Sequence, residues 1–408
     1  MASRFPHRRN PDDDSKVSNF ELFYDLVFVF AITQTTHLLI EDLTWLGALE
    51  SGMILLMVWW AWQYTTWVTN ELNPDAIPVR LVLVVIMLGS LLMSIAIPEA
   101  FGDKAMLFAG SYVFIQVGRH LFLTFIAADQ GTLERSRAAH ILNWFSVSAI
   151  FWILGALAGG DTQIILWLVA LTIDSSGPIF VYYVPWLNKL DTEAWAISTD
   201  HFAERFQLFT IIALGESIVL TGATTSALEF DTPRIIAFVS AFVGSVTIWW
   251  LYFNYVSTIV QHHLSEASET IRMAKSVFVY GHFPVIAGIV LTAVGDELII
   301  AHPTHHLETA ALIAVISGPV IYLLSFGPIR FSITGTWPVR RLVGALACLA
   351  VGVIAEVTHI SGMSVGLAIV AIFIAVILSE RSTPVRKELV YSPESGSGSR
   401  AASAPQTS

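Results

Sequence analysis

Apolar residues in this chain run continuously rather than alternating with polar ones. A helix needs about 20 apolar residues to cross the hydrocarbon core of a bilayer, whereas a barrel strand would alternate. The runs therefore predict membrane-spanning helices. About twelve spans are predicted, near 20–40, 45–68, 80–99, 105–128, 138–158, 162–184, 205–224, 234–258, 272–294, 306–328, 340–358 and 363–379. The predicted fold is an all-α polytopic membrane protein.

The composition agrees with this prediction. Of the 408 residues, 55% are hydrophobic and only 13% are charged, whereas a soluble chain is about 25% charged. The polar opening segment lacks the small-residue cleavage site of a signal peptide, so the first run is expected to remain as a span. Cys348 is the single cysteine, which excludes an internal disulfide and a cysteine-built metal site. No metal, other cofactor or nucleic-acid partner is expected.

The basic residues predict the orientation. If the N-terminus is cytoplasmic, all 21 Lys and Arg residues except Lys104 and Arg234 lie in cytoplasmic segments or at cytoplasmic helix ends. This distribution follows the positive-inside rule for short loops. The sequence therefore predicts a multi-pass protein of the cell (plasma) membrane, the bacterial inner membrane, with both termini in the cytoplasm.

The two halves of the chain share several features. A Trp-Trp pair followed by an aromatic-amide-aromatic cluster occurs in the second span, at 59–64, and in the eighth, at 249–255. The third and ninth spans both start beside an arginine and end in Gly-Asp. An even number of spans per half would make the copies parallel. The predicted organisation is a cytoplasmic N-terminal tail (1–18), a first six-helix repeat (19–184), a cytoplasmic hinge (185–204), a second six-helix repeat (205–380) and a disordered C-terminal tail (381–408).

Ionisable residues inside the spans are the candidates for chemistry. Each costs about 2.5–3.5 kcal/mol at the bilayer centre and therefore needs a partner, a cavity or water. The candidates for transport or ion coupling are Asp25, Asp174, Glu216, Glu21 and Glu204. The candidate charge partners are Arg119, Arg205, His201, His120 and His282.

Structural roles are the alternative for several of these residues. Glu21 and Glu204 lie at helix starts, where an acid complements the helix dipole. His201, Glu204 and Arg205 could form a clamp between two helices, and His282 could serve only as a hydrogen-bonding residue between helices. The effect of the helix dipole has faded at Asp25, Asp174 and Glu216, which lie beyond the first turn. A functional role is therefore favoured for them over a buried pair with Arg119 or a histidine.

Three motifs carry a resemblance to a known family. They are Phe-Glu-Leu-Phe-Tyr-Asp-Leu-Val-Phe-Val-Phe-Ala at 20–31, His-Phe-Ala-Glu-Arg at 201–205 and Leu-Gly-Glu at 214–216. In this order they resemble the bacterial low temperature requirement protein A (LtrA) family, over roughly residues 18–380. The resemblance implies a polytopic membrane protein linked by name to growth in the cold, and it implies no defined activity.

The leading hypothesis is a proton- or cation-coupled secondary transporter or permease, in which Asp25, Asp174 and Glu216 share a cavity between the repeats. One alternative is a cation channel with the same acids along a continuous pore. A further alternative is a membrane-embedded enzyme acting on a lipid or isoprenoid, with His201 and Glu204 as acid and base.

Common catalytic motifs are missing from the sequence, among them Gly-x-x-x-x-Gly-Lys, His-Glu-x-x-His and Gly-x-Ser-x-Gly. An enzyme is therefore the less favoured interpretation, and no catalytic residue is assigned. The expected partners are the lipid bilayer and an unknown small solute or cation, and the sequence leaves homo-oligomerisation open.

Overall fold

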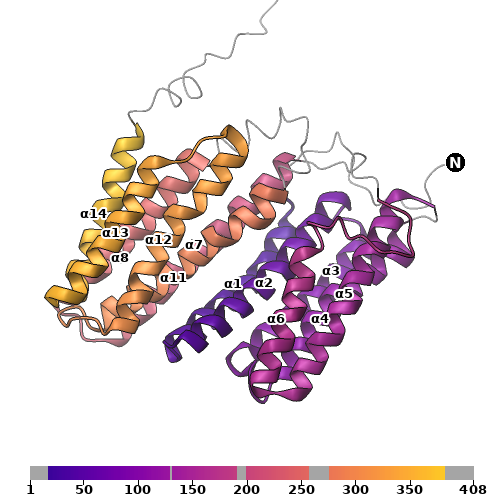
Figure 1. Ribbon diagram of the computed structural model, residues 1–408, viewed down its shortest axis with the longest axis horizontal. Coiled ribbons are helices and arrows are strands. Elements are labelled where there is room, and N and C mark those ends of the chain that lie inside the picture. Colours follow the sequence, from indigo (N-terminus) through magenta and orange to yellow (C-terminus); the bar gives the residue numbers. More distant parts are fainter. Residues whose placement is uncertain (1–16, 129–130, 191–198, 257–274, 382–408) are drawn as a thin grey trace, which may run out of the picture.

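A computed structural model describes residues 17–128, 131–190, 199–256 and 275–381. These residues form long helices and no β-sheet (Figure 1). The first half contains α1 (Asn19–Glu41), α2 (Trp45–Glu71), α3 (Ile77–Ala96), α4 (Ala105–Phe122), α5 (Leu133–Ala158) and α6 (Gly160–Ser176). The second half contains α7 (Thr199–Ala227), α8 (Thr232–Leu251), α11 (His282–Ala301), α12 (Thr309–Thr334), α13 (Val339–Thr358) and α14 (Gly362–Arg381).

Short irregular turns extend several of these helices. A 3₁₀ turn, η1 (Ile97–Glu99), follows α3. Three π-helical turns are η2 (Leu123–Ala127) after α4, η3 (Tyr252–Val256) after α8 and η4 (Lys275–Gly281) before α11. All three lie at the end of the bundle where α1 begins, which we call the basic end because most of the described Lys and Arg residues fall there.

The all-α membrane fold predicted from the sequence is confirmed. Within the described residues, 11 helices are long and apolar enough to cross a membrane. The remaining helix, α6, has 17 residues, which is about 26 Å at the usual rise per residue. This is slightly less than the hydrocarbon thickness of about 30 Å.

The sixth helix is shorter than the span predicted at 162–184. It ends at Ser176, and the chain then turns, with Val181 and Tyr182 both at φ 51°. Pro178 explains the end, because it has no N–H to donate to the carbonyl of Asp174. The turn carries Tyr182 back toward α2, where its hydroxyl lies 2.5 Å from that of Tyr64.

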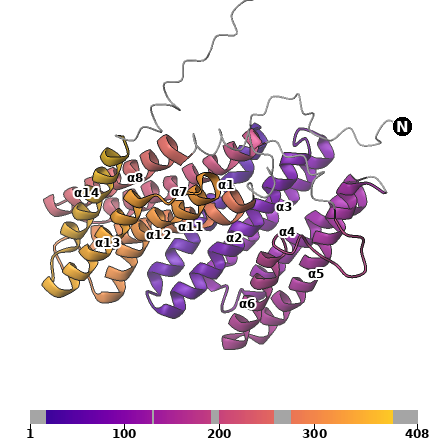
Figure 2. The same cartoon turned by 45° about the horizontal axis from the view of Figure 1, so that its top comes forward.

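The helices of each half have a regular set of neighbours. In the first half, α1 contacts α2 and α3, each of the helices from α3 to α6 contacts the next, and α2 contacts α6. In the second half, α7 contacts α8 and α11, each of the helices from α11 to α14 contacts the next, and α8 contacts α14. The halves meet where α1 and α2 contact α7 and α11 (Figures 1 and 2).

Parts of the predicted organisation lie outside the described residues. These parts are residues 1–16 of the N-terminal tail, residues 191–198 of the hinge, the C-terminal tail after Arg381, and the span ends at 257–258 and 272–274. In the described part, α7 begins at Thr199. The motif at 201–205 is therefore helical.

Two glycines allow α11 and α12 to pack backbone to backbone. A Cβ atom at Gly288 would lie 2.7 Å from the backbone nitrogen of Tyr322, and one at Gly318 would lie 2.5 Å from that of Thr292. Small residues allow this approach between helices in lipid, where packing replaces the hydrophobic effect as the driving force. Helix α7 packs on the α11 side of this pair.

Candidate functional site

Helices α1 and α7 bring four buried ionisable side chains together near the basic end. Glu21 and Asp25 belong to α1, His201 and Arg205 belong to α7, and none is more than 1% exposed. Nη2 of Arg205 donates to Oδ1 of Asp25 at 2.7 Å, and Nη1 lies 3.5 Å from Oε1 of Glu21. Nε2 of His201 lies 3.0 Å from the same Glu21 oxygen. We call these four residues the α1–α7 charge cluster.

The start of α1 fixes the orientation of Glu21. The Ser18 hydroxyl accepts a hydrogen bond from the Glu21 backbone N–H, and Oε2 of Glu21 accepts one from the Ser18 backbone N–H at 2.9 Å. This is a capping box. It holds one carboxylate oxygen at the helix start and leaves Oε1 facing α7. Glu21 therefore has both a helix-capping contact and an interhelical one.

Helix α2 supports the cluster from a third side. The Trp62 indole N–H donates to Oδ1 of Asp25 at 2.8 Å. The amide nitrogen of Asn70 lies 3.2 Å from Nδ1 of His201. If this amide donates, the remaining ring proton of a neutral His201 is on Nε2, facing Glu21. With a neutral histidine the two acids and one arginine give a net charge of about −1, which one proton would cancel.

Glu204 lies outside the cluster. It is half-buried, and its Oε2 accepts a hydrogen bond from the backbone N–H of Val17 at 3.0 Å. The contact ties α7 to the residues that precede α1. His201, by contrast, has no exposed surface, so the two residues proposed as acid and base in the enzyme alternative lie in different surroundings.

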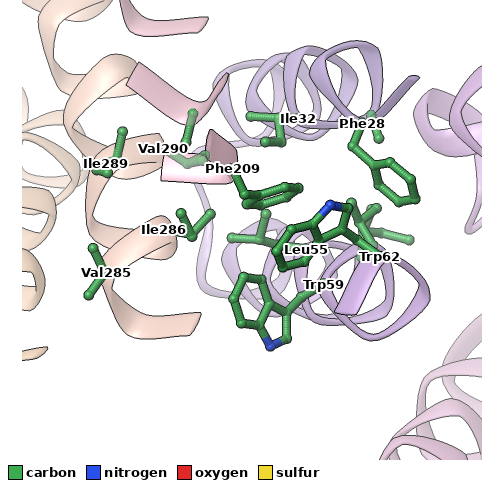
Figure 3. Close-up of a cluster of buried hydrophobic side chains, with 14 of the residues drawn as sticks. Phe28, Ile32, Leu55, Trp59, Trp62, Phe209, Val285, Ile286, Ile289 and Val290 are labelled. Atoms are coloured by element: carbon green, nitrogen blue, oxygen red, sulfur yellow. The ribbon is translucent and has the colours of Figure 1, made fainter. Parts of the chain in front are cut away.

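Aromatic side chains fill the interface between the halves beside the charge cluster (Figure 3). The Phe209 ring lies 4.1 Å from the Trp62 ring and 5.7 Å from the Trp59 ring, measured between centroids. Phe28 of α1 packs on the same phenylalanine at 6.5 Å. All four side chains are at least 98% buried. We call Phe28, Trp59, Trp62 and Phe209 the aromatic plug.

Glu216 lies beyond the plug, against α1. It is 11 residues from Arg205 on the same helix, or about 17 Å along the axis. The Thr33 hydroxyl donates to its Oε2 at 2.5 Å, and its buried Oε1 has no hydrogen-bond partner within the described residues. His37 and Glu297 are close enough to interact electrostatically with it. The interface therefore has a polar group on each side of the plug.

Asp174 has a separate environment in the first half. Its Oδ2 accepts hydrogen bonds from the Tyr112 hydroxyl at 3.0 Å and the Trp152 indole N–H at 3.1 Å. It is 2% exposed. These bonds join α4, α5 and α6.

A chain of hydrogen bonds leads from Asp174 back to α1. The Gln116 amide donates to the Tyr112 hydroxyl at 3.1 Å, and the oxygen of the same amide accepts from Arg119. Arg119 in turn donates to the Thr65 hydroxyl at 2.9 Å, which also accepts from Tyr24 at 2.9 Å. Tyr24 precedes Asp25 in the chain. The network therefore connects the Asp174 site to the helix that carries half of the charge cluster.

The two remaining candidate histidines bond within the bundle. Nδ1 of His120 is 2.8 Å from the carbonyl of Gln116, one turn earlier on α4. His282 bonds through Nε2 to the Tyr252 hydroxyl at 2.9 Å and through Nδ1 to the Val277 carbonyl at 2.8 Å. His282 therefore links η3, the turn after α8, to the start of α11.

A further buried ion pair was not singled out from the sequence. Arg341 of α13 donates to both carboxylate oxygens of Glu380 on α14, at 2.8 and 3.1 Å, and lies over the Phe326 ring. All three residues belong to the second half. This pair joins helices within one half, whereas the α1–α7 charge cluster joins the two halves.

A cavity of about 270 Å³ opens at the basic end, between α2, α5, the turn after α6 and two π-helical turns. Most of its lining belongs to the first half, and Lys275 and Val279 of η4 close it from the second half. Tyr64 and Tyr182 lie in its wall. The Tyr64 ring also lies 5.5 Å from the Arg119 guanidinium.

The structure separates the three deep acids that the transport hypothesis placed in one pocket. Asp25 is paired with Arg205, Glu216 lies beyond the plug, and Asp174 lies where α6 packs on α5. The cavity is lined by none of the three.

Several polar partners were also missed at the sequence level. They are Trp62 and Asn70 around the charge cluster, Thr33 at Glu216, and Tyr112 and Gln116 in the network. All of them could have been found from the sequence by the same feature: each is a side chain that needs a hydrogen-bond partner within an otherwise apolar span.

Comparisons with known proteins agree with the motifs. The sequence model of the family described as bacterial low temperature requirement A protein (LtrA) matches residues 16–378, which confirms the resemblance predicted from the motifs. An uncharacterized protein of Rhizobium meliloti (strain 1021) is 36% identical over 327 residues, which cover 79% of this chain and 80% of that protein. No solved structure matches the chain.

Proposed function

We propose that this chain, which belongs to the bacterial low temperature requirement A (LtrA) family, is a secondary transporter coupled to protons or another cation. Its termini would lie in the cytoplasm, on the side that carries most of the basic residues. The path for the coupling ion would follow the interface between α1 and α7. The cavity at the basic end would hold the solute.

The observation that carries the proposal is the α1–α7 charge cluster. A buried ion pair often stabilises a fold no better than apolar residues of the same size, because desolvation offsets the attraction. Here Asp25 and Arg205 are buried in the membrane region and come from opposite halves of the chain. An ion pair across two bodies can break when they move apart, and the freed carboxylate can then bind a proton or cation.

The neighbour pattern supports a parallel repeat. In each half the first helix contacts the second and third, the later helices contact in chain order, and the second contacts the sixth. Transporters built from such repeats move one repeat against the other around a site near their junction. The junction here is formed by α1 and α2 against α7 and α11.

The aromatic plug supports a closed state of a transporter. Along the interface it lies between Asp25 and Glu216. Its side chains pack closely (Figure 3), and the nearest ring centroids are 4.1 Å apart. A transporter must keep its two sides from opening at once, whereas a channel needs a continuous polar pore. Movement of Phe209 with α7 would connect the two polar sites.

Proton flux into proteoliposomes tests the proposal. Vesicles containing the purified protein and an internal pH dye are given a Na⁺ or K⁺ gradient, and the change in internal pH is followed. Wild-type vesicles should show flux above empty vesicles, and Asp25→Asn and Glu216→Gln should each reduce it by about tenfold or more. Asp75→Asn, at a side chain that is 65% exposed, is the control and should retain full flux.

Two results would contradict the proposal. Flux in both variants equal to that of wild type, or wild-type vesicles indistinguishable from empty ones under both gradients, would remove its basis. Single-channel currents in planar bilayers would favour the channel alternative instead, because a transporter gives none.

A further inference from the structure

The cavity at the basic end contains more hydrogen-bonding capacity than its own residues use. Gln63 and His120 line it and are 1% and 2% exposed. The Gln63 oxygen accepts from the Trp67 indole, and its amide nitrogen has no partner within the described residues. His120 uses Nδ1 for the Gln116 carbonyl and likewise has no described partner for Nε2.

A tyrosine pair adds a third group to the same wall. The hydroxyls of Tyr64 and Tyr182 are 2.5 Å apart, and either can be the donor. One hydrogen is used in that bond, so the hydrogen of the accepting hydroxyl has no acceptor among the described residues. The wall therefore offers an amide donor, a hydroxyl donor and a ring nitrogen.

The backbone around the cavity is unusual in two respects. Tyr182 and its neighbour Val181 both have φ 51°, a left-handed conformation that is costly for residues other than glycine. Such strain persists where the surroundings impose it and is concentrated at functional sites. Two of the π-helical turns, η2 and η4, also contribute lining residues, and π-helical turns are often found at functional sites.

Among the described residues, the charged side chains that line the cavity balance. Its lining includes Glu71 and Glu134 on the one hand and Arg137 and Lys275 on the other, and Arg137 bonds to Glu71. The rest of the lining is largely apolar and includes the Trp67 ring. A ligand with a net charge would gain little here. The volume of 270 Å³ is close to the lower limit of about 300 Å³ for small-molecule sites.

We propose that this cavity binds an uncharged amphipathic ring compound that carries carbonyl or hydroxyl oxygens, the chemical class to which quinones belong. The flat ring would lie against Trp67 and Tyr64, and its oxygens would accept from Gln63 and the tyrosine pair. An acyl chain fits less well, because it would leave these buried polar groups without partners. The inference rests on the proposed function only where it takes this compound to be the transported solute. Binding itself can be measured without transport.

Equilibrium binding to the purified protein in nanodiscs tests the inference. Menadione, an uncharged naphthoquinone, is the probe. Its ring-sulfonated analogue tests the requirement for neutrality, and decanol tests the acyl-chain alternative. Menadione should bind with a dissociation constant in the micromolar range, and both comparison compounds should bind about tenfold more weakly or worse.

Variants locate the site. Ala138 lines the cavity and is 5% exposed, so Ala138→Phe should fill the space and weaken menadione binding by about tenfold or more. Ala158→Phe, at an exposed position of the same helix, is the matched control and should bind as wild type does. Gln63→Leu keeps the side-chain size and removes both the amide donor and the oxygen that accepts from the Trp67 indole. It should weaken menadione binding without filling the cavity.

Each outcome supports or overturns the inference. Equal binding by wild type, Ala138→Phe and Gln63→Leu would overturn it, and so would tighter binding of decanol or of the sulfonate. Binding without proton flux would keep the inference and remove the transport proposal. Proton flux that follows the predicted variant pattern, without menadione binding, would keep the transport proposal and overturn the inference.

Discussion

Arg205 offers the sharpest test of how the two halves are held together. Its guanidinium lies 2.7 Å from Asp25 and 3.5 Å from Glu21, and all three side chains are buried. Arg205→Met would leave two acids without their shared cation. Removing one partner of a buried pair costs about 3–5 kcal/mol, and the loss of two contacts favours the upper part of that range.

A double-mutant cycle separates the pair from the burial of each residue. Asp25→Leu combined with Arg205→Met should cost less than the sum of the single changes, because the double variant buries one uncompensated charge fewer. The expected interaction energy is about 0.5–3 kcal/mol in magnitude. Arg80→Met is the control: Arg80 pairs with Asp75 at 2.6 Å, but the side chains are 45% and 65% exposed, so its loss should cost about 0–1 kcal/mol.

The measurement is the free energy of unfolding in mixed micelles, with the melting temperature in detergent as a second readout. An Arg205→Met variant that is no more destabilised than Arg80→Met would refute a structural role for the buried cation. Strictly additive free-energy changes in the double-mutant cycle would also refute the reasoning, because they would mean that the two residues do not interact.

Three further changes test the packing. Gly318→Ala would place a Cβ 2.5 Å from the α11 backbone and should destabilise the protein by about 1–3 kcal/mol. Gly222→Ala, with open space around it, is the control and should be neutral or stabilising. Equal melting temperatures of the two variants would contradict this. Trp62→Phe keeps a ring in the aromatic plug but removes the hydrogen bond to Asp25, so it should cost about 1–3 kcal/mol, and wild-type stability would show the bond to be unimportant. Cys348 has no exposed surface, so a thiol reagent should label it only after unfolding; rapid labelling of the folded protein would contradict the packing of α13.

Charged contacts in the second half give a useful contrast. Arg341 and Glu380 form a bidentate buried pair, but both belong to that half. Their separation should not change when one half moves against the other. The α1–α7 charge cluster differs in that its acids and its arginine come from opposite halves, and this is why the transport proposal depends on it.

The sequence by itself determined the helical membrane fold and its family. Hydropathy is a local property: a continuous apolar run of about 20 residues has no other stable form in lipid than a helix. The spans, the acids within them and the motifs at 20–31 and 201–205 could therefore be predicted from the order of residues alone. The end of α6 at Ser176 could also have been predicted from Pro178, which follows closely.

Only the tertiary structure decided which of these residues meet. Lipid and protein interior are similarly apolar, so the buried and lipid-facing sides of a span differ little in hydropathy and the sequence pattern does not reveal the packing face. Asp25 and Arg205 are 180 residues apart, and nothing local indicates that they pair. The packing of α4, α5 and α6 likewise brings Asp174 against Tyr112 of α4 and Trp152 of α5, because each buried acid is stabilised by whichever polar groups the neighbouring helices present.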